Sequence, residues 1–205
     1  MVASSGCGKQ ANANTDYQPH RQDNPKNFKA IDSAIKFLRN GDIALRTGAD
    51  VISVMLRGMN QQDKTYSHCG IVMIEDGCPF VYHSIGGEDN PDSHLQRDSA
   101  THFFSPISNE RLGIARLPLT PVQIDSLHAI VRRYYAAGTP FDMDFDLKTN
   151  DKLYCAEFVY KSVEEAINDT SYFSTSEVLN RRYVAVDNIT DKRHAKMVCD
   201  VQYKL

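Results

Sequence analysis

A cysteine at the predicted start of a helix is the strongest nucleophile candidate in this sequence. Apolar residues recur at helical spacing from about Tyr154 to Ile167, and Cys155 lies in the first turn of that segment, after the expected capping residues Asn150 and Asp151. A helix N-terminus favours a thiolate, and its free N–H groups can form part of an oxyanion hole. The same position also suits a small buried core residue, so position alone leaves both interpretations open.

Two histidines lie on neighbouring predicted strands. If Asp76-Gly77 forms a two-residue hairpin, Gly70 lies opposite His83, and His68 becomes a diagonal neighbour of His83 on the same face. One imidazole could then act as a general base while the second orients it, and Gly70 leaves room beside them. A three-residue loop would instead place the two rings on opposite faces of the sheet.

A metal site is the competing interpretation of His68, Cys69, His83 and Cys155. The sequence contains no C-x-x-C, H-x-x-x-H or H-E-x-x-H spacing, and adjacent strand residues such as His68 and Cys69 point to opposite faces. We therefore expect no metal and no other cofactor. A second polar cluster, in the loop after Gly138, is expected to serve loop hydrogen bonding rather than a cation or a basic substrate group; its members are Asp142, Asp144 and Asp146.

The elements that must position these residues form one α+β domain, which we predict to span 28–205 after a flexible tail at 1–27. The periodicity and turn residues predict an antiparallel arrangement of strands with helices packed on it. The predicted helices are 28–40, 51–57, from Pro121 to Ala137, and 154–167; the predicted strands are 43–46, 67–75, 80–85 and 112–117, with one or two more in 182–203 and a loop over 90–108.

Composition narrows the class of protein. The chain has 205 residues, 41% of them hydrophobic, which is enough for one core without disulfides. The net charge is −3, so the chain lacks the overall positive charge that is typical of nucleic-acid-binding proteins. No apolar stretch is long enough for a transmembrane helix. Five scattered cysteines are an odd number, so at least one is unpaired or engaged elsewhere.

The polar tail contains one of these cysteines. Ser4-Ser5-Gly6-Cys7 is similar to the end of a bacterial lipoprotein signal, although the apolar segment that normally precedes it is missing. Cys7 is therefore either a lipid attachment point, which implies the cell envelope, or an exposed thiol on a plain flexible terminus, in which case a cytoplasmic location stays open.

Several blocks occur in an order that resembles a known family, the YiiX-like permuted papain-fold hydrolases, which are relatives of the NlpC/P60 cysteine peptidases and of lecithin–retinol acyltransferase. The most specific block is Leu153-Tyr154-Cys155-Ala156-Glu157; the others are Gly41-Asp42-Ile43, Ser67-His68-Cys69-Gly70-Ile71-Val72, Val81-Tyr82-His83-Ser84 and the Phe-Asp-rich loop 141–146. The resemblance spans about 28–167. It implies a circularly permuted papain-like (NlpC/P60) fold with Cys155 as nucleophile, His68 as general base and His83 as orienter.

The function expected from the residues and the resemblance together is acyl transfer to Cys155 followed by hydrolysis, most simply of an amide bond in a small molecule or a peptide such as cell-wall peptide. The backbone N–H of Cys155, with a polar side chain such as Tyr66, would stabilise the oxyanion. The alternatives are a lipid or ester acyltransferase or thioesterase, a non-catalytic envelope module that binds a ligand, and a plain structural domain.

Overall fold

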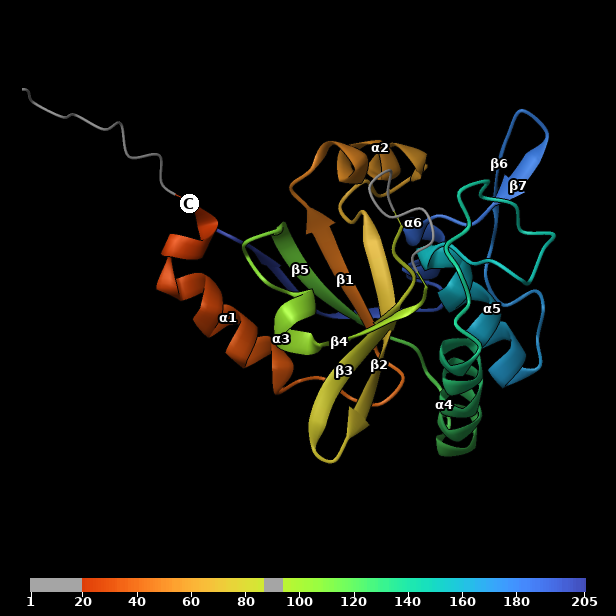
Figure 1. Cartoon of the computed structure of the whole chain (residues 1–205), viewed down its shortest axis with the longest axis horizontal. Helices are drawn as coiled ribbons and strands as arrows, with labels where there is room; N and C mark the ends of the chain where they lie inside the picture. The colour runs from red at the N-terminus through yellow and green to blue at the C-terminus, as the bar shows by residue number, and fades with distance from the viewer. Residues whose placement is uncertain (1–19, 87–93) are drawn as a thin grey trace, which may run out of the picture.

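The structure, a computed structural model, describes residues 20–86 and 94–205 of the chain. A six-stranded antiparallel sheet forms its centre, with the strand order β4-β3-β2-β1-β5-β8, and helices cover both of its faces (Figure 1). The expected α+β class, with an antiparallel sheet packed against helices, is therefore confirmed. No helix in the described ranges is long and apolar enough to cross a bilayer.

The helices and strands follow one another along the chain with short connections. The strands are β1 (Ile43–Gly48), β2 (His68–Glu75), β3 (Cys78–His83), β4 (Gln96–Ser99), β5 (Asn109–Arg116), β6 (Ser176–Val178), β7 (Arg181–Tyr183) and β8 (Lys196–Gln202). The helices are η1 (Arg21–Asp23), α1 (Pro25–Ile35), α2 (Val51–Met59), α3 (Ala100–Phe103), α4 (Pro121–Ala136), α5 (Cys155–Ile167) and α6 (Val186–Ile189). Strands β6 and β7 form a separate two-stranded hairpin.

The two faces of the sheet carry different cores. On one face, α4 and α5 pack over Cys69, Ile71 and Met73 of β2. On the other, α1 and α3 pack over Val72 and its partner Val81. Because successive strand residues point to opposite faces, β2 contributes to both cores and is buried on both sides.

The β2–β3 hairpin has the register that the two-residue turn predicted. Glu75 pairs with Cys78, and the pairing continues to Ile71 and Tyr82. Asp76 and Gly77 both have positive φ, as a type I′ turn requires. This register places His68 and His83 on one face of the sheet.

Three local predictions need correction. The first helix begins at Pro25, capped by the Asn24 side chain, so the described fold includes residues 20–27, which had been assigned to the tail. The predicted loop over 90–108 contains strand β4, whose polar Gln-Arg-Asp-Ser sequence lacks the alternation that normally indicates a strand. Helix α5 is capped by Tyr154 and Glu157, whose carboxylate accepts the Tyr154 N–H, and not by Asn150 or Asp151.

Candidate functional site

A chain of three side chains crosses strands β2, β3 and β4 on one face of the sheet. Nε2 of His68 lies 2.9 Å from Nδ1 of His83, and Nε2 of His83 lies 3.1 Å from a carboxylate oxygen of Asp98. The strand pairing explains the alignment, because Asp98 faces Val81 across β3–β4 and so shares the face of His83. Sequence reasoning missed Asp98, because it missed the strand that carries it.

Gly70 lies where this chain of side chains needs space. A Cβ at position 70 would come within 2.8 Å of the His83 Cβ and within 2.7 Å of the Tyr82 carbonyl oxygen. The absence of a side chain at Gly70 therefore lets the His83 ring lie against β2 and reach His68.

The carboxylate at the end of the chain fixes the tautomers of both rings. A carboxylate only accepts, so His83 donates from Nε2 to Asp98 and accepts at Nδ1 from the Nε2–H of His68. Nδ1 of His68 is then the atom with a free lone pair, and no hydrogen bond within residues 20–86 and 94–205 occupies it. Asp98, His83 and His68 together present one basic nitrogen.

Burial keeps this base neutral. His68 and His83 are both buried, and burial lowers the pKa of each imidazole, that of His68 to well below its ordinary value. The Arg46 guanidinium and the His83 ring lower the pKa of His68 further. The hydrogen bond with His83 holds the pKa of Asp98 below its ordinary value, so the carboxylate stays ionised. His68 is thus neutral near neutral pH, which is the form that can act as a proton acceptor.

Cys155 is the first residue of α5 and is buried. The Cys69 thiol donates a hydrogen bond to the Cys155 sulphur, and the backbone N–H groups of Cys69 and Ala156 donate as well. These bonds and the Arg46 charge lower the pKa of Cys155, although burial opposes the change. The same pairing raises the pKa of Cys69, which therefore keeps its proton and remains the donor.

The thiol and the base approach the start of β2 from opposite faces of the sheet. The His68 ring lies 5.8 Å from the ring of Phe103, on the α3 face, whereas Cys155 packs with Cys69 on the α5 face. No hydrogen bond in the described ranges joins Cys155 to His68. The structure therefore brings His68 and His83 together and places Cys155 beside the residue that follows His68.

Two further contacts join the histidine-bearing strands to the segment that carries Cys155. The Ser84 hydroxyl, next to His83, donates to the Leu153 carbonyl at 2.5 Å, two residues before Cys155. Ser67, next to His68, lines the same small cavity as Cys155. One neighbour of each histidine, Ser67 or Ser84, thus borders the segment that carries the thiol.

Arg46 is the second residue that sequence reasoning missed. It pairs directly with His68 across β1–β2, it donates to the Phe103 carbonyl at 3.4 Å, and its guanidinium lies 4.7 Å from the Phe103 ring centre. No carboxylate in the described part of the chain lies within ion-pair distance of it. The Arg46 guanidinium interacts at longer range with the carboxylates of Asp98 and Asp50, and its charge favours a thiolate at Cys155.

Tyr66, suggested as an oxyanion donor, is engaged elsewhere. Its hydroxyl donates to Asp200 of β8 at 2.8 Å, under Gly113 of β5. Because that hydrogen bond fixes the ring against β5 and β8, the donors beside Cys155 are backbone N–H groups.

Comparison with known proteins gives one finding about the fold. No family model and no curated protein matches the sequence. Among solved structures, the crystal structure of the metalloprotein YiiX from Escherichia coli O157:H7 superposes with a TM-score of 0.66 at 17% identity. The match covers 80% of this chain and 98% of that one. The chain shares its fold with YiiX.

YiiX is described as a metalloprotein, so we asked whether the residues here fit a metal ion. In the described ranges no three His, Cys, Asp or Glu side chains converge on a point. Nε2 of His68 and Nδ1 of His83 point at each other across 2.9 Å, with no space for an ion about 2 Å from each. In this chain, His68 and His83 therefore form a hydrogen-bonded pair, and the two rings are not arranged as ligands of a metal ion.

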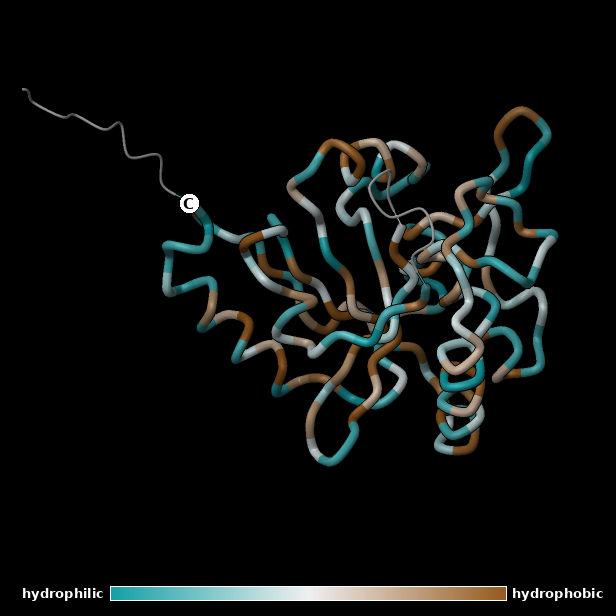
Figure 2. Tube along the Cα trace, in the orientation of Figure 1, coloured by the Kyte–Doolittle hydropathy of each residue, from teal (hydrophilic) through white to brown (hydrophobic). Residues whose placement is uncertain are grey.

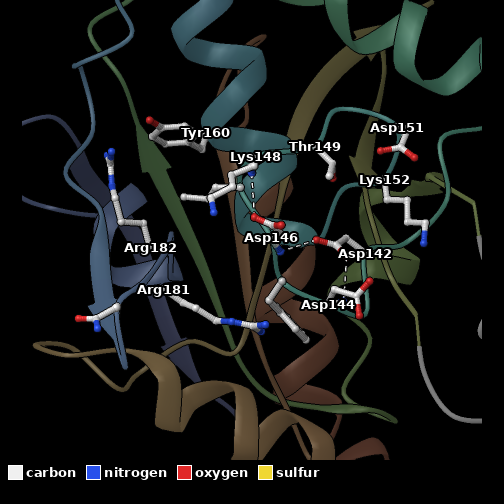
Figure 3. A pocket seen from close by; sticks show the side chains of 13 residues that line it. Asp142, Asp144, Asp146, Lys148, Thr149, Asp151, Lys152, Tyr160, Arg181 and Arg182 are labelled. Carbon is white, nitrogen blue, oxygen red and sulfur yellow. Dashed lines mark hydrogen bonds between the residues drawn. The ribbon is translucent and has the colours of Figure 1, made fainter.

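Two cavities of different character adjoin the α5 end of this YiiX-like fold. The cavity at Cys155 is narrow and lined by apolar side chains of α2 and the 184–186 segment. The second is a charged hollow of about 630 Å³, lined by acidic and basic side chains from the 142–152 loop and β7 (Figure 3). Phe145 lines both, so a ligand in the charged hollow lies one side chain from the Cys155 cavity.

Two of the three acidic residues of that loop, Asp142 and Asp146, make the loop hydrogen bonds expected of them. Asp142 is buried and accepts the backbone N–H groups of Asp144 and Asp146, and Asp146 accepts that of Lys148 (Figure 3). These bonds hold the loop in a tight turn, with Phe145 between the two cavities that it lines.

Proposed function

We propose that the protein is a cysteine-dependent hydrolase of the permuted papain type, with Cys155 as nucleophile, His68 as general base and His83 as the orienting residue. The observation that carries the proposal is the hydrogen-bonded series Asp98–His83–His68, which leaves Nδ1 of a neutral His68 free at the strand end where, on the other face of the sheet, a cysteine of lowered pKa packs. A neutral buried base and an acidified thiol near the same strand end are the pair that thiol catalysis needs.

The reaction follows from these roles. The Cys155 sulphur attacks the acyl carbon while its proton passes to Nδ1 of His68, and the carbonyl oxygen becomes an oxyanion beside the N–H groups at the start of α5. The imidazolium then gives its proton to the leaving group, and a thioester remains on Cys155. Water, deprotonated by His68, attacks the thioester and releases the acid and the free thiol.

The approach of His68 to Cys155 belongs to the bound state in this proposal. Catalytic hydrogen bonds are often absent from a ligand-free site and form only with substrate. Ser67, the residue before His68, lines the Cys155 cavity, so a substrate that enters it lies next to the strand end that carries the base.

An amide bond is the proposed target, in a small molecule or a peptide. The hollow beside Phe145 supports it, because carboxylates and cations together suit the charged termini and side chains of a peptide, cell-wall peptide included. Residues 1–19 lie outside the described structure, so lipidation of Cys7 and an envelope location remain predictions. Lipid or ester acyl transfer is the second candidate, favoured by the apolar lining of the Cys155 cavity.

Alkylation kinetics test the proposal without knowledge of the substrate. We expect iodoacetamide near neutral pH to label Cys155 faster than the exposed Cys78, which serves as the internal standard. A His68→Ala variant should lose that advantage while Cys78 reacts as before, as mapped by peptide mass spectrometry. If Cys155 reacts no faster than Cys78 in the parent protein, the thiol is not activated and the hydrolase proposal fails.

A further inference from the structure

Large apolar side chains project into solvent from two elements at one end of the molecule. Helix α2 exposes Val51 (85%) and Met55 (63%), and the β6–β7 turn exposes Leu179 (93%). Both elements lie at the top of Figure 1, and Figure 2 shows hydrophobic residues on α2 and at the tip of the hairpin. The fold gives these side chains no partner in the described ranges.

Helix α2 is unusual in that none of its residues is buried. Its sequence is Val-Ile-Ser-Val-Met-Leu-Arg-Gly-Met, and Asp50 caps it by accepting the Ser53 N–H. A helix this short normally depends on packing of an apolar face for its stability. The outward apolar side chains of α2 add nothing to the core, so the fold does not account for them.

The turn between β6 and β7 is equally unexplained by folding. Leu179 and Asn180 both have positive φ, the conformation for which hairpins select Asn and Gly. A leucine there carries a conformational cost and an exposed apolar surface at the same time. The Leu179 side chain therefore contributes nothing to the core of the described fold.

The two elements are joined next to the candidate site. The Tyr183 hydroxyl of β7 donates to the Met59 carbonyl at the end of α2, and Gln61 donates to that hydroxyl. Leu56 and Met59 of α2 line the cavity at Cys155 on their other side. One end of the molecule thus combines the outward apolar groups with the opening toward the thiol.

Arginines flank the apolar groups. Arg57 lies within α2, and Arg181 and Arg182 follow the β6–β7 turn directly and are exposed. Figure 3 shows Arg181 and Arg182 together on β7, at the border of the charged hollow. Apolar side chains that insert below the headgroups, with arginines at headgroup level, are typical of elements that bind a lipid surface.

We propose that α2 and the β6–β7 turn form a membrane-docking surface that binds a bilayer containing anionic lipid. Val51, Met55 and Leu179 insert into the interface, and the flanking arginines contact phosphate groups. Two protruding apolar tips separated by polar residues suit a deformable lipid surface better than the flat complementary patch of a protein partner. The inference concerns binding alone and is independent of the proposed hydrolase activity.

The chain has no Trp, which allows a direct test. We would place a single Trp at Met55→Trp, at Leu179→Trp, or at Val122→Trp as the matched control. Val122 is 74% exposed on α4, which lies at the opposite end of the molecule in Figure 1. Vesicles of phosphatidylcholine with phosphatidylglycerol should shift the emission of the first two variants to the blue and leave the Val122→Trp variant unchanged.

Cosedimentation of the full chain with the same vesicles supplies the second measurement. Leu179→Asp, and Val51→Asp together with Met55→Asp, should weaken binding by about tenfold or more, whereas Val122→Asp should not. Absence of binding, or an equal blue shift at all three Trp positions, would overturn the proposal. So would self-association without vesicles that the Asp substitutions abolish, because the surface would then bind a second copy of the chain.

Discussion

Each face of strand β2 carries buried titratable groups, but the two faces favour different protonation states. On the α3 face, the imidazoles of His68 and His83 are kept neutral by burial, and the carboxylate of Asp98 sets which nitrogen is basic. On the α5 face, hydrogen-bond donors stabilise the charged form of Cys155 against the same burial. Desolvation therefore acts on both faces, and local hydrogen bonds decide whether the charged or the neutral form prevails.

A strand is a suitable place to join the base and the thiol. Neighbouring strand residues point to opposite faces of the sheet. His68 therefore carries the base on one face, while Cys69, the next residue, contacts the Cys155 thiol on the other. Each group can then be tuned in its own surroundings, and Arg46, beside His68, acts on both, since it lowers the pKa of His68 and that of Cys155. Substitutions on one face should change one group and leave the other intact.

Loss of the base should have the largest effect. His68→Gln removes the free Nδ1, and we expect the rate of acyl transfer from an activated ester such as p-nitrophenyl acetate to fall by about 10²–10⁴-fold. His128→Gln, on α4, is the control, because it removes an imidazole outside the Asp98–His83–His68 series. Equal rates in the His68→Gln and parent proteins would show that the α3 face takes no part in the reaction.

Loss of the carboxylate should have a smaller effect of the same kind. Asp98→Asn lets the side-chain amide donate to His83, so the tautomers of both rings are no longer fixed and Nδ1 of His68 is basic in only part of the population. We expect a loss of activity with the same substrate that is smaller than the loss of about 10²–10⁴-fold in His68→Gln, because part of the population keeps a basic Nδ1. Asp200→Asn replaces a carboxylate that bonds Tyr66 and Arg111 instead, and it should leave the activity unchanged.

The sequence predicted the hairpin, and with it the histidine pair, because turn chemistry and a period of two depend only on nearby residues. Asp98 was missed because strand β4 is a polar edge strand, and its pairing with β3 depends on the whole sheet. The cap of α5 was assigned to Asn150 and Asp151 for a related reason. Tyr154 and Glu157 form that cap inside the core, where side-chain burial is a property of the fold.

The contact between Cys69 and Cys155 was equally beyond local reasoning. The strand period correctly separates Cys69 from His68, but which helix packs on the Cys69 face follows from tertiary structure. Arg46 is a similar case, since only the β1–β2 register places it beside His68. The histidine pair was predictable; the contacts through which Cys69 acts on Cys155 and Arg46 acts on His68 were not.

Removal of the thiol donor should raise the pKa of the nucleophile. In Cys69→Ala, Cys155 loses the hydrogen bond that contributes most to its lowered pKa, so the pH profile of alkylation should move to higher pH. A rise of one unit would lower the rate near neutral pH by about tenfold. Cys69→Ser keeps a donor and should recover much of the difference, which a purely steric role for Cys69 does not predict.

The last expected effect is on stability, and it is confined to the histidine face. His68 and His83 have lower pKa values in the folded state than the unfolded value of about 6.5, so below that pH the unfolded chain binds protons that the fold excludes. Their contribution is complete above about pH 6.5 and is lost as the pH falls, at up to about 1.4 kcal/mol per pH unit for each ring. Urea unfolding between about pH 5 and pH 7 should show this slope.

The same measurement on substituted proteins separates the two faces. His68→Gln with His83→Gln should flatten the dependence of the unfolding free energy on pH, because neither glutamine titrates. Cys69→Ala should retain the slope of the parent protein, since the pKa of the Cys69 thiol is raised above an ordinary value that already lies above this range. If the thiol substitution flattens the dependence of the unfolding free energy on pH as much as the histidine substitutions do, protonation on one face of β2 depends on the other face. Independent tuning of base and nucleophile across β2 would then be wrong.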